Sequence, residues 1–112
     1  SHYAPGENLM IDVVWTPFNK IDAYYSASVR VVDANGNKIV AQDREPLVST
    51  FLWTPGVPVQ DRFVLKLPSE LVPGNYSIQV MLYQADQGID ALLLDWEFKP
   101  RAILELGTFT VN

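Results

Sequence analysis

The most constraining feature of this sequence is a two-residue alternation of apolar and other side chains, interrupted at short intervals by proline and glycine. Four segments carry the alternation, at residues 9–16, 24–31, 63–67 and 76–83. Successive side chains of a β-strand point to opposite faces, so a period of two predicts strands with one buried face. The eight prolines and six glycines separate these segments and predict the turns between them. The pattern predicts an all-β chain.

The spacing of these strands predicts an antiparallel β-sandwich. About seven or eight short strands, set roughly 8–12 residues apart, are typical of immunoglobulin-like and fibronectin-III-like domains, and a small barrel is the alternative. A chain of 112 residues is long enough for one domain, which we expect at residues 8–112 after a loose N-terminal tail at 1–7. The alternation assigns these residues to the core: Ile11, Val13, Trp15, Val29, Val31, Leu65, Tyr76, Ile78 and Val80.

Turn signals define several connections. The segment Asp33–Asn37 contains Asn-Gly, a pair that supplies the backbone conformation of hairpin turns. A second hairpin loop is expected at residues 84–90, around Gly88. The run Pro73-Gly74-Asn75-Tyr76 fits a tyrosine corner, in which the tyrosine hydroxyl binds backbone upstream, and it equally fits a plain core tyrosine.

The C-terminal strand contains an irregularity. Leu104 and Leu106 share one parity, whereas Phe109 and Val111 have the other. A β-bulge at Gly107 would return both pairs to one face of the sheet. The preceding stretch, residues 91–98, also alternates and predicts a further strand.

Charge and composition exclude several classes of function. Thirteen acidic and eight basic residues give a net charge of −5, which opposes binding to nucleic acid or to an anionic membrane. Cysteine is absent, which excludes disulfides, Cys-ligated zinc and thiol catalysis. No apolar run approaches the roughly 20 residues of a membrane helix. The first residues have no basic stretch followed by an apolar one, so we expect no signal peptide within this sequence. Because the sequence starts at Ser1 rather than at Met, we expect it to be part of a longer protein.

No group of residues predicts catalysis or a metal site. The carboxylates of Asp43-Arg44-Glu45 and Asp61-Arg62 are interpreted as solvated loop charge, and the one histidine, His2, lies in the expected tail. Asp33-x-Asn35-x-Asn37 resembles part of a calcium loop, but Lys38 follows it and no glutamate closes it. We therefore expect a hairpin turn there, no metal, no cofactor and no enzymatic activity.

Aromatic residues raise the possibility of sugar stacking, which requires exposed rings. Trp15 and Trp96 share parity with core aliphatic residues, so we expect both to be buried. Trp53, beside the Pro55-Gly56 turn, and Tyr24 and Tyr83, on outward parity, are the candidate ligand-binding residues.

Apolar residues on outward parity suggest an interface. Val14, Met81 and Tyr83 represent this set, which also includes Met10, Val32 and Val64. If these side chains are contiguous, they form a patch that docks on the rest of the same polypeptide or on a second copy in a weak homodimer. The alternative is that they are scattered, as single apolar residues ordinarily are on protein surfaces.

Several short motifs also occur in a recognisable order. They are Leu9 to Trp15, Tyr25 to Gly36, Val40-Ala41-Gln42-Asp43 with Pro46, Trp53-Thr54-Pro55-Gly56 with Val59 and Asp61, Leu67-Pro68, Pro73 to Tyr76, Leu82-Tyr83, and Leu106 to Val111. Together they cover residues 8–111. In this order they resemble the sandwich domain that follows the membrane-spanning part of some bacterial protein-mannosyltransferase-like glycosyltransferases and related multi-pass proteins. The chain departs from that pattern at Gly88 to Arg101, where it is apolar and contains Trp96 instead of a shorter polar loop.

The resemblance implies a non-catalytic accessory or interaction domain. Such a domain would lie outside the bacterial cytoplasmic membrane, in the periplasm or at the cell surface, tethered through a membrane segment. Its partner would be the rest of its own polypeptide. A carbohydrate-binding module that binds a glycan is the alternative.

Overall fold

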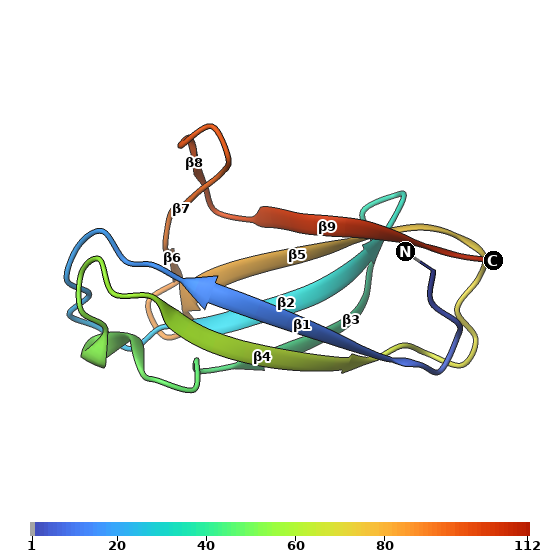
Figure 1. Ribbon diagram of the computed structural model, residues 1–112, viewed down its shortest axis with the longest axis horizontal. Helices are drawn as coiled ribbons and strands as arrows, with labels where there is room; N and C mark the ends of the chain where they lie inside the picture. Colours follow the sequence, from blue (N-terminus) through green and yellow to red (C-terminus); the bar gives the residue numbers. More distant parts are fainter. Residues whose placement is uncertain (1) are drawn as a thin grey trace.

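A two-stranded antiparallel sheet lies over one face of a larger antiparallel sheet in the computed structural model, which describes residues 2–112 (Figure 1). The smaller sheet pairs β1 (Asn8–Trp15) with β4 (Val59–Lys66). The larger sheet has the order β3 (Lys38–Arg44), β2 (Ser26–Asp33), β5 (Gly74–Gln84), with β9 (Leu104–Val111) and β6 (Ile89–Asp90) on different parts of the remaining edge of β5. The described residues contain no α-helix, only a 3-10 turn at Thr50–Leu52. The prediction of an all-β chain is confirmed.

The core lies between the two sheets and follows the alternation of the sequence. Along β1, buried and exposed residues alternate strictly from Asn8 to Trp15, and Pro17 follows the strand with no N–H to continue a ladder. Of the predicted core residues, all are buried except Ile78, which is partly buried and packed against the others. The alternation therefore identified the core face of β1, β2, β4 and β5 correctly. The expectation that Val32 is exposed is wrong, because β2 lies between β3 and β5 and also buries Ser28 and Val32 on its outward parity.

The predicted turns are also present. The carboxylate of Asp33 accepts the backbone N–H groups of Asn35 and Asn37, both at 2.9 Å, and Gly36 occupies the left-handed region with a φ of 82°. These contacts close the β2–β3 hairpin. A second hairpin joins β5 to β6 across Gly88, as expected. The Tyr76 hydroxyl donates to the backbone oxygen of Val72, which confirms the contact expected of a tyrosine corner.

The bulge in the last strand is confirmed, with one difference from expectation. Gly107 pairs with Ile78 and Glu105 with Gln79, so Leu106 has no partner residue on β5. The bulge brings Leu104 onto the core side, with Phe109 and Val111 further along the strand. Leu106 remains exposed because it is the extra residue of the bulge.

The N-terminal segment differs from the expected loose tail. Tyr3 donates its backbone N–H to the oxygen of Thr110 and packs its ring edge-on against Phe109, with centroids 5.3 Å apart. Glu7 accepts the N–H of Leu67 on its backbone oxygen. Residues 2–7 are thus bound along the body of the domain, whereas Ser1 lies outside the described residues.

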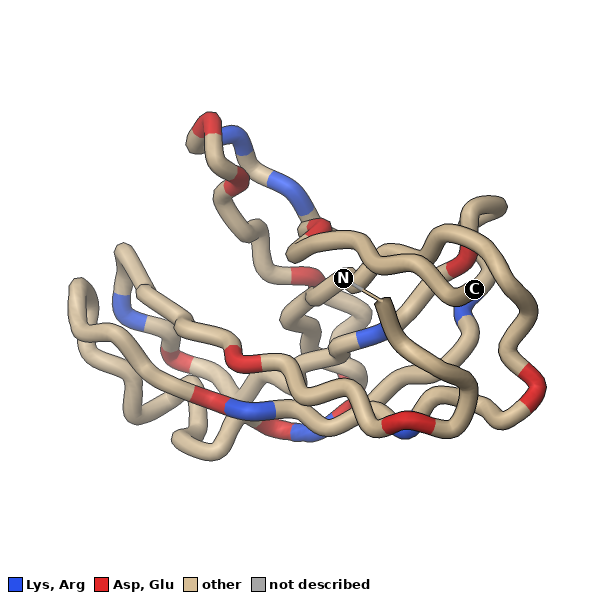
Figure 2. Tube along the Cα trace, turned by 45° about the vertical axis from the view of Figure 1, so that its right-hand side comes forward, with Lys and Arg blue, Asp and Glu red and all other residues tan. Residues whose placement is uncertain are grey.

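The expected strand at residues 91–98 is replaced by a small hairpin. Only Leu93–Leu94 (β7) is extended there, and it pairs with Pro100–Arg101 (β8). This β7–β8 hairpin projects from the body in two views (Figures 1 and 2). With these short elements, residues 2–112 form nine strands, three of which have two residues each.

Candidate binding site

The three aromatic residues predicted to bind a ligand have different surroundings. Trp53 belongs to the core, with 3% of its surface exposed, a ring 5.8 Å from that of Trp15 and an indole N–H donated to the oxygen of Val48 at 2.8 Å. It therefore forms no exposed platform. Tyr24 is exposed, but one face of its ring stacks on Phe51 at a centroid distance of 5.3 Å.

Tyr83 lies on the outer face of β5 in a polar network. Its hydroxyl donates to the carboxylate of Asp43 at 2.7 Å, and Asp43 also accepts the hydroxyl of Ser28 at 2.9 Å. The hydrogen bond to Asp43, followed by partial burial, raises the pKa of Tyr83 above its ordinary value. The hydroxyl of Tyr83 is therefore already used in a hydrogen bond within the larger sheet.

The predicted interface residues do not form one patch. Val14 is exposed on the outer face of the smaller sheet. Met81 and Tyr83 alternate with the core residues Val80 and Leu82 and therefore lie on the outer face of the larger sheet. The sulfur of Met81 also accepts a hydrogen bond from Arg30 at 3.3 Å. The core separates Val14 from the other two, so the three residues do not form the single patch on which the docking prediction depended.

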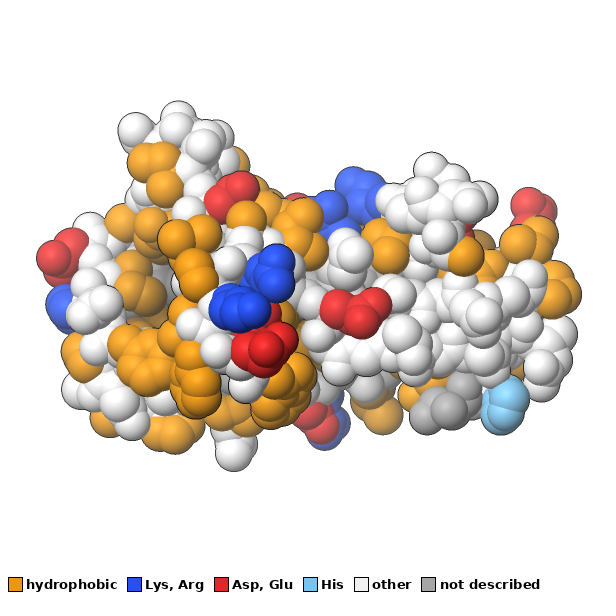
Figure 3. All heavy atoms as spheres, turned by 90° about the horizontal axis from the view of Figure 1, so that it is seen from above, with side chains coloured by type: hydrophobic (Ala, Val, Ile, Leu, Met, Phe, Trp, Pro, Cys, Tyr) orange, Lys and Arg blue, Asp and Glu red, His pale blue; other side chains and the backbone are white. Residues whose placement is uncertain are grey.

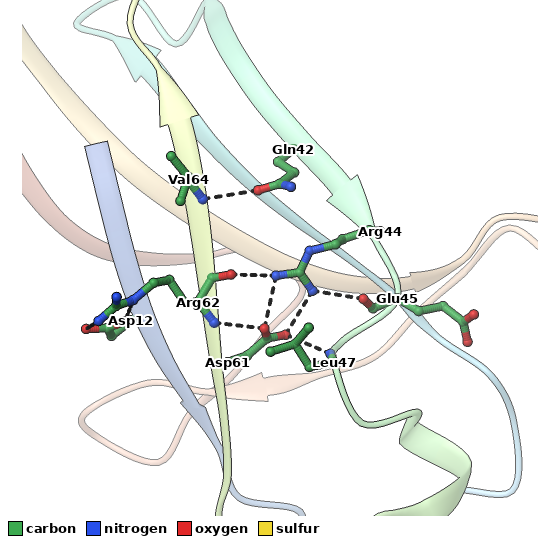
Figure 4. Close-up of polar contacts among 8 residues, drawn as sticks. All are labelled: Asp12, Gln42, Arg44, Glu45, Leu47, Asp61, Arg62 and Val64. Atoms are coloured by element: carbon green, nitrogen blue, oxygen red, sulfur yellow. Dashed lines mark hydrogen bonds and ion pairs between the residues drawn. The ribbon is translucent and has the colours of Figure 1, made fainter. Parts of the chain in front are cut away.

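The two charged segments that we expected to be solvated are joined by an ion pair between Arg44 and Asp61 (Figure 4). For Asp61 the expectation of a solvated loop charge is wrong. Asp61 lies within β4, its side chain is fully buried, and its carboxylate forms a two-pronged ion pair with Arg44 at 3.0 and 3.1 Å. The backbone N–H groups of Leu47 and Arg62 donate to the same carboxylate. Because these donors occupy both oxygens, Asp61 is a structural group and is not placed to activate a water molecule.

The same contacts join β3 to β4. Arg44 donates to the backbone oxygen of Arg62 at 2.6 Å and lies 4.0 Å from the ring centroid of Phe63. Gln42 accepts the N–H of Val64 at 3.2 Å. Sequence reasoning missed Asp61, although its parity with Phe63 and Leu65 places it on the buried face. We call the side of the molecule where these side chains of β3 bind β4 the clamped side.

The opposite side of the molecule is open and contains an apolar groove of about 1080 Å³. Its walls come from the end of β1 and the following loop, from the β7–β8 hairpin and from the start of β9. The lining includes all three tryptophans of the sequence, namely Trp15, Trp53 and Trp96. The indole N–H of Trp15 is buried and lacks a hydrogen-bond partner.

The β7–β8 hairpin exposes the largest apolar side chains of the groove. Trp96 has 93% of its surface exposed, Phe98 75% and Leu92 68%. Hydrophobic side chains are concentrated at this end of the molecule (Figure 3). The expectation that Trp96 is buried is wrong, because the chain turns at Asp95 instead of continuing as a strand.

The turn of this hairpin uses the same contacts as the turn at Asp33. The carboxylate of Asp95 accepts the N–H groups of Glu97 at 2.8 Å and Lys99 at 2.9 Å, and it pairs with Arg101 at 3.1 Å. Phe98 occupies the position that Gly36 has in the other turn, with a φ of 59°. Left-handed backbone is unfavourable for a bulky side chain. The chain thus retains a strained, exposed phenylalanine beside the groove, and such strain is commonest at functional sites.

The charges that line the groove have one sign. Asp90, Asp95 and Glu105 are part of its wall, and no lysine or arginine among the described residues is. Asp95 is engaged by its turn and by Arg101. The groove therefore combines an apolar wall with an acidic margin.

Metal binding has no support in the side-chain arrangement. Within residues 2–112, no three histidine, cysteine, aspartate or glutamate side chains cluster in a way that could hold a metal ion. Asp33, the first residue of the calcium-like sequence, holds its own turn, and the hydrogen bond from the backbone N–H of Asn37 is the main reason that its pKa is lowered.

Comparison of the sequence with protein-family models and with curated proteins gives no match. Among the described residues, no helix has the length and hydrophobicity needed to cross a membrane. The open groove is the candidate site, and of the binding and interface residues predicted from sequence only Val14 and Trp53 line it.

Proposed function

We propose that this chain is a non-catalytic interaction domain that binds a partner in the groove between β1, the β7–β8 hairpin and β9. The observation that carries the proposal is the exposure of Leu92, Trp96 and Phe98 along one wall of that groove. Contiguous exposed apolar surface is costly in water and marks interaction sites in soluble domains. The strained backbone of Phe98 supports the same site.

We further propose that the fold is a sandwich of the immunoglobulin or fibronectin-III type. The facing sheets, the shared core and the hydrogen bond from Tyr76 to Val72 support this assignment. Domains of this type commonly carry their binding residues on loops and strand ends. The groove lies at such an end.

An accessory role outside the bacterial cytoplasmic membrane is also part of the proposal. It is supported by the resemblance of residues 8–111 to the domain that follows the membrane-spanning part of mannosyltransferase-like proteins. In that setting the domain would be tethered through a membrane segment, and its partner would be the rest of the same polypeptide.

Carbohydrate binding is the second candidate, and the exposed indole of Trp96 is the observation that favours it. A sugar platform combines such a ring with polar neighbours that bind hydroxyl groups. The exposed residues near Trp96 along the chain include the apolar Leu92, Leu94 and Phe98. The charged neighbours Glu97 and Lys99 pair with each other at 3.9 Å. Of the residues first considered, Trp53 is buried, and Tyr24 and Tyr83 have partners of their own.

The test compares wild type with Leu92→Ser and a matched control, Leu47→Ser. The two leucines are similarly exposed, at 68% and 72%, but only Leu92 lines the groove. Each protein is tested against a displayed library of random peptides, a glycan array and neutral phosphatidylcholine vesicles. We expect selected peptides to bind wild type and Leu47→Ser and to bind Leu92→Ser about tenfold more weakly.

Other outcomes separate the candidates. Glycan binding that is lost in Trp96→Ala, without a change in melting temperature, would establish the carbohydrate alternative instead. Absence of binding to all three classes, or binding that is equal in the two leucine variants, would overturn the role assigned to the groove.

A further inference from the structure

Two strand edges border the groove. Residues 13–16, at the end of β1, line it consecutively, and so do residues 104–106 at the start of β9. Consecutive side chains of a strand point to opposite faces, so a surface that touches all of them follows the edge of the strand. Within the described residues, β1 pairs only with β4, and β9 pairs with β5.

The backbone groups that β1 presents to this edge can be identified. On β4, the N–H of Val64 and the oxygen of Arg62 are bonded to Gln42 and Arg44, so both point away from β1. Residues directly opposite each other in an antiparallel ladder either bond to one another or both point away. Arg62 lies opposite Asp12, and Val64 lies opposite Met10. Asp12 and Met10, and by the same alternation Val14, therefore direct their N–H and C=O groups to the free edge.

The free edge of β1 has little protection against pairing. Proteins protect exposed edges with proline, lysine, bulges or covering segments. In β9 the bulge at Leu106 serves this purpose, and on the clamped side the outer edge of β4 is covered by side chains of β3. β1 contains no proline or basic residue, and Asp12 is its only charge.

The charge at the groove indicates what could pair there. Asp90 and Glu105 belong to its wall without a lining lysine or arginine, and the chain as a whole carries −5. This field attracts a basic partner and repels a second copy of the chain. A polypeptide also brings carbonyl oxygens, which are the acceptors that the buried indole N–H of Trp15 lacks.

We propose that the occupant of the groove is an extended polypeptide segment that adds as a strand to the free edge of β1. Its apolar side chains pack against the wall formed by Leu92, Trp96 and Phe98, and its lysine or arginine residues lie near Asp90 and Glu105. The proposal rests on the proposed function, since it names the partner of the same groove. Strand addition supplies affinity through main-chain hydrogen bonds and specificity through alternate side chains.

The test uses peptides selected from a displayed library of random dodecapeptides. Their binding is followed by the emission of the tryptophans, all of which line the groove. Val14→Pro removes an N–H that points to the free edge, at a strand position where proline is tolerated. Val14→Thr is the matched control that keeps the N–H. The double variant Asp90→Asn with Glu105→Gln tests whether these two carboxylates attract basic residues of the peptide.

We expect the selected sequences to alternate apolar and other residues and to be enriched in lysine or arginine. Val14→Pro should weaken binding about tenfold and Val14→Thr should not, with circular dichroism confirming that both variants fold. Methylation of alternate backbone nitrogens in the peptide should give the same loss in the wild-type protein. The double charge variant should bind more weakly at low salt and lose most of its salt dependence.

The contrary results are distinct. Peptides that bind in a Leu92-dependent manner but are insensitive to both Val14→Pro and backbone methylation would overturn strand addition and leave the interaction role standing. Selected sequences without basic residues would overturn the pairing of lysine or arginine residues with Asp90 and Glu105. Failure to select any peptide, together with a negative glycan array and no binding to the vesicles, would overturn the proposed function as well.

Discussion

The smaller sheet meets the larger sheet along two long sides of the molecule. The contacts between the sheets differ between these two sides. On the clamped side, Arg44 and Gln42 of β3 bond to the backbone and the buried carboxylate of β4. On the open side, β1 and β9 do not pair, and a groove with exposed apolar residues separates them. On the clamped side the polar groups are hydrogen-bonded within the domain. On the open side backbone groups and apolar surface remain available to a partner. We therefore assign stability mainly to the first side and binding to the second.

Arg44→Met is the substitution with the largest expected effect on this comparison. It leaves the fully buried carboxylate of Asp61 without its counter-charge, and breaking a buried pair in this way costs about 3–5 kcal/mol of unfolding free energy. The partial exposure of Arg44, 26% of its side chain, favours the lower end of that range. Chemical denaturation measures the change.

The matched control for that experiment is Arg62→Met. Arg62 also pairs with an aspartate, Asp12 at 2.6 Å, but both side chains are largely exposed. Ion pairs in water contribute little to stability, so this variant should unfold almost as wild type does. Equal losses in the two variants would show that the clamp is no more than a surface ion pair.

Phe98→Gly tests the comparison at the open side. The turns at Asp33 and Asp95 use equivalent hydrogen bonds, but only the second places a bulky residue in left-handed backbone. Relief of that strain should raise the free energy of opening the β7–β8 hairpin by about 1 kcal/mol. Amide hydrogen exchange at residues 93–101 measures it. We also expect weaker binding in the groove, because the aromatic ring is lost.

The reciprocal variant, Gly36→Phe, should act in the opposite direction. A Cβ at Gly36 would meet no atom within 4 Å, so we expect the cost to come mainly from the left-handed backbone, about 1–2 kcal/mol. Stability unchanged in Gly36→Phe would mean that the left-handed position carries no strain in either turn, and it would remove the argument that Phe98 is retained for binding.

The alternation in the sequence predicted the body of the fold because β1, β2, β4 and β5 each direct one parity of side chains into the core. The same rule failed for Trp96, which shares parity with Leu92 and Leu94 much as Trp15 does with Ile11 and Val13. What differs is Asp95, whose carboxylate binds two downstream N–H groups and turns the chain. The spacing Asp95-x-Glu97-x-Lys99 parallels Asp33-x-Asn35-x-Asn37, but without glycine it gave no turn signal.

The candidate site could be predicted less well than the fold. The groove depends on two distant strands failing to pair, and neither β1 nor β9 differs in composition from a strand that has two neighbours. Asp61 could have been identified, since it falls on the buried parity of β4. Outward parity marked Val14, Met81 and Tyr83 but could not show that they belong to opposite sheets, because parity is defined within each strand separately.

The smallest expected effect is a local response of the two turns to acid. The backbone N–H of Lys99 is the main cause that lowers the pKa of Asp95 below its ordinary value of 3.8, and Arg101 adds to it. The pKa of Asp33 is lowered in the same way, mainly through Asn37. A carboxylate whose pKa is lower in the folded state contributes stability above its unfolded pKa and loses it as the pH falls through the folded value.

Acidification should therefore loosen the β7–β8 hairpin before it affects the β2–β3 hairpin. Only two residue pairs support the first hairpin, whereas the second continues into a long ladder. We expect the amide signals of residues 93–101 to be constant from about pH 5 to 8 and to change below the ordinary aspartate pKa. In Asp95→Asn, which lacks the titrating carboxylate and its ion pair with Arg101, that acid transition should be absent. A transition at residues 93–101 near neutral pH, or one that persists in Asp95→Asn, would show that another group controls the hairpin.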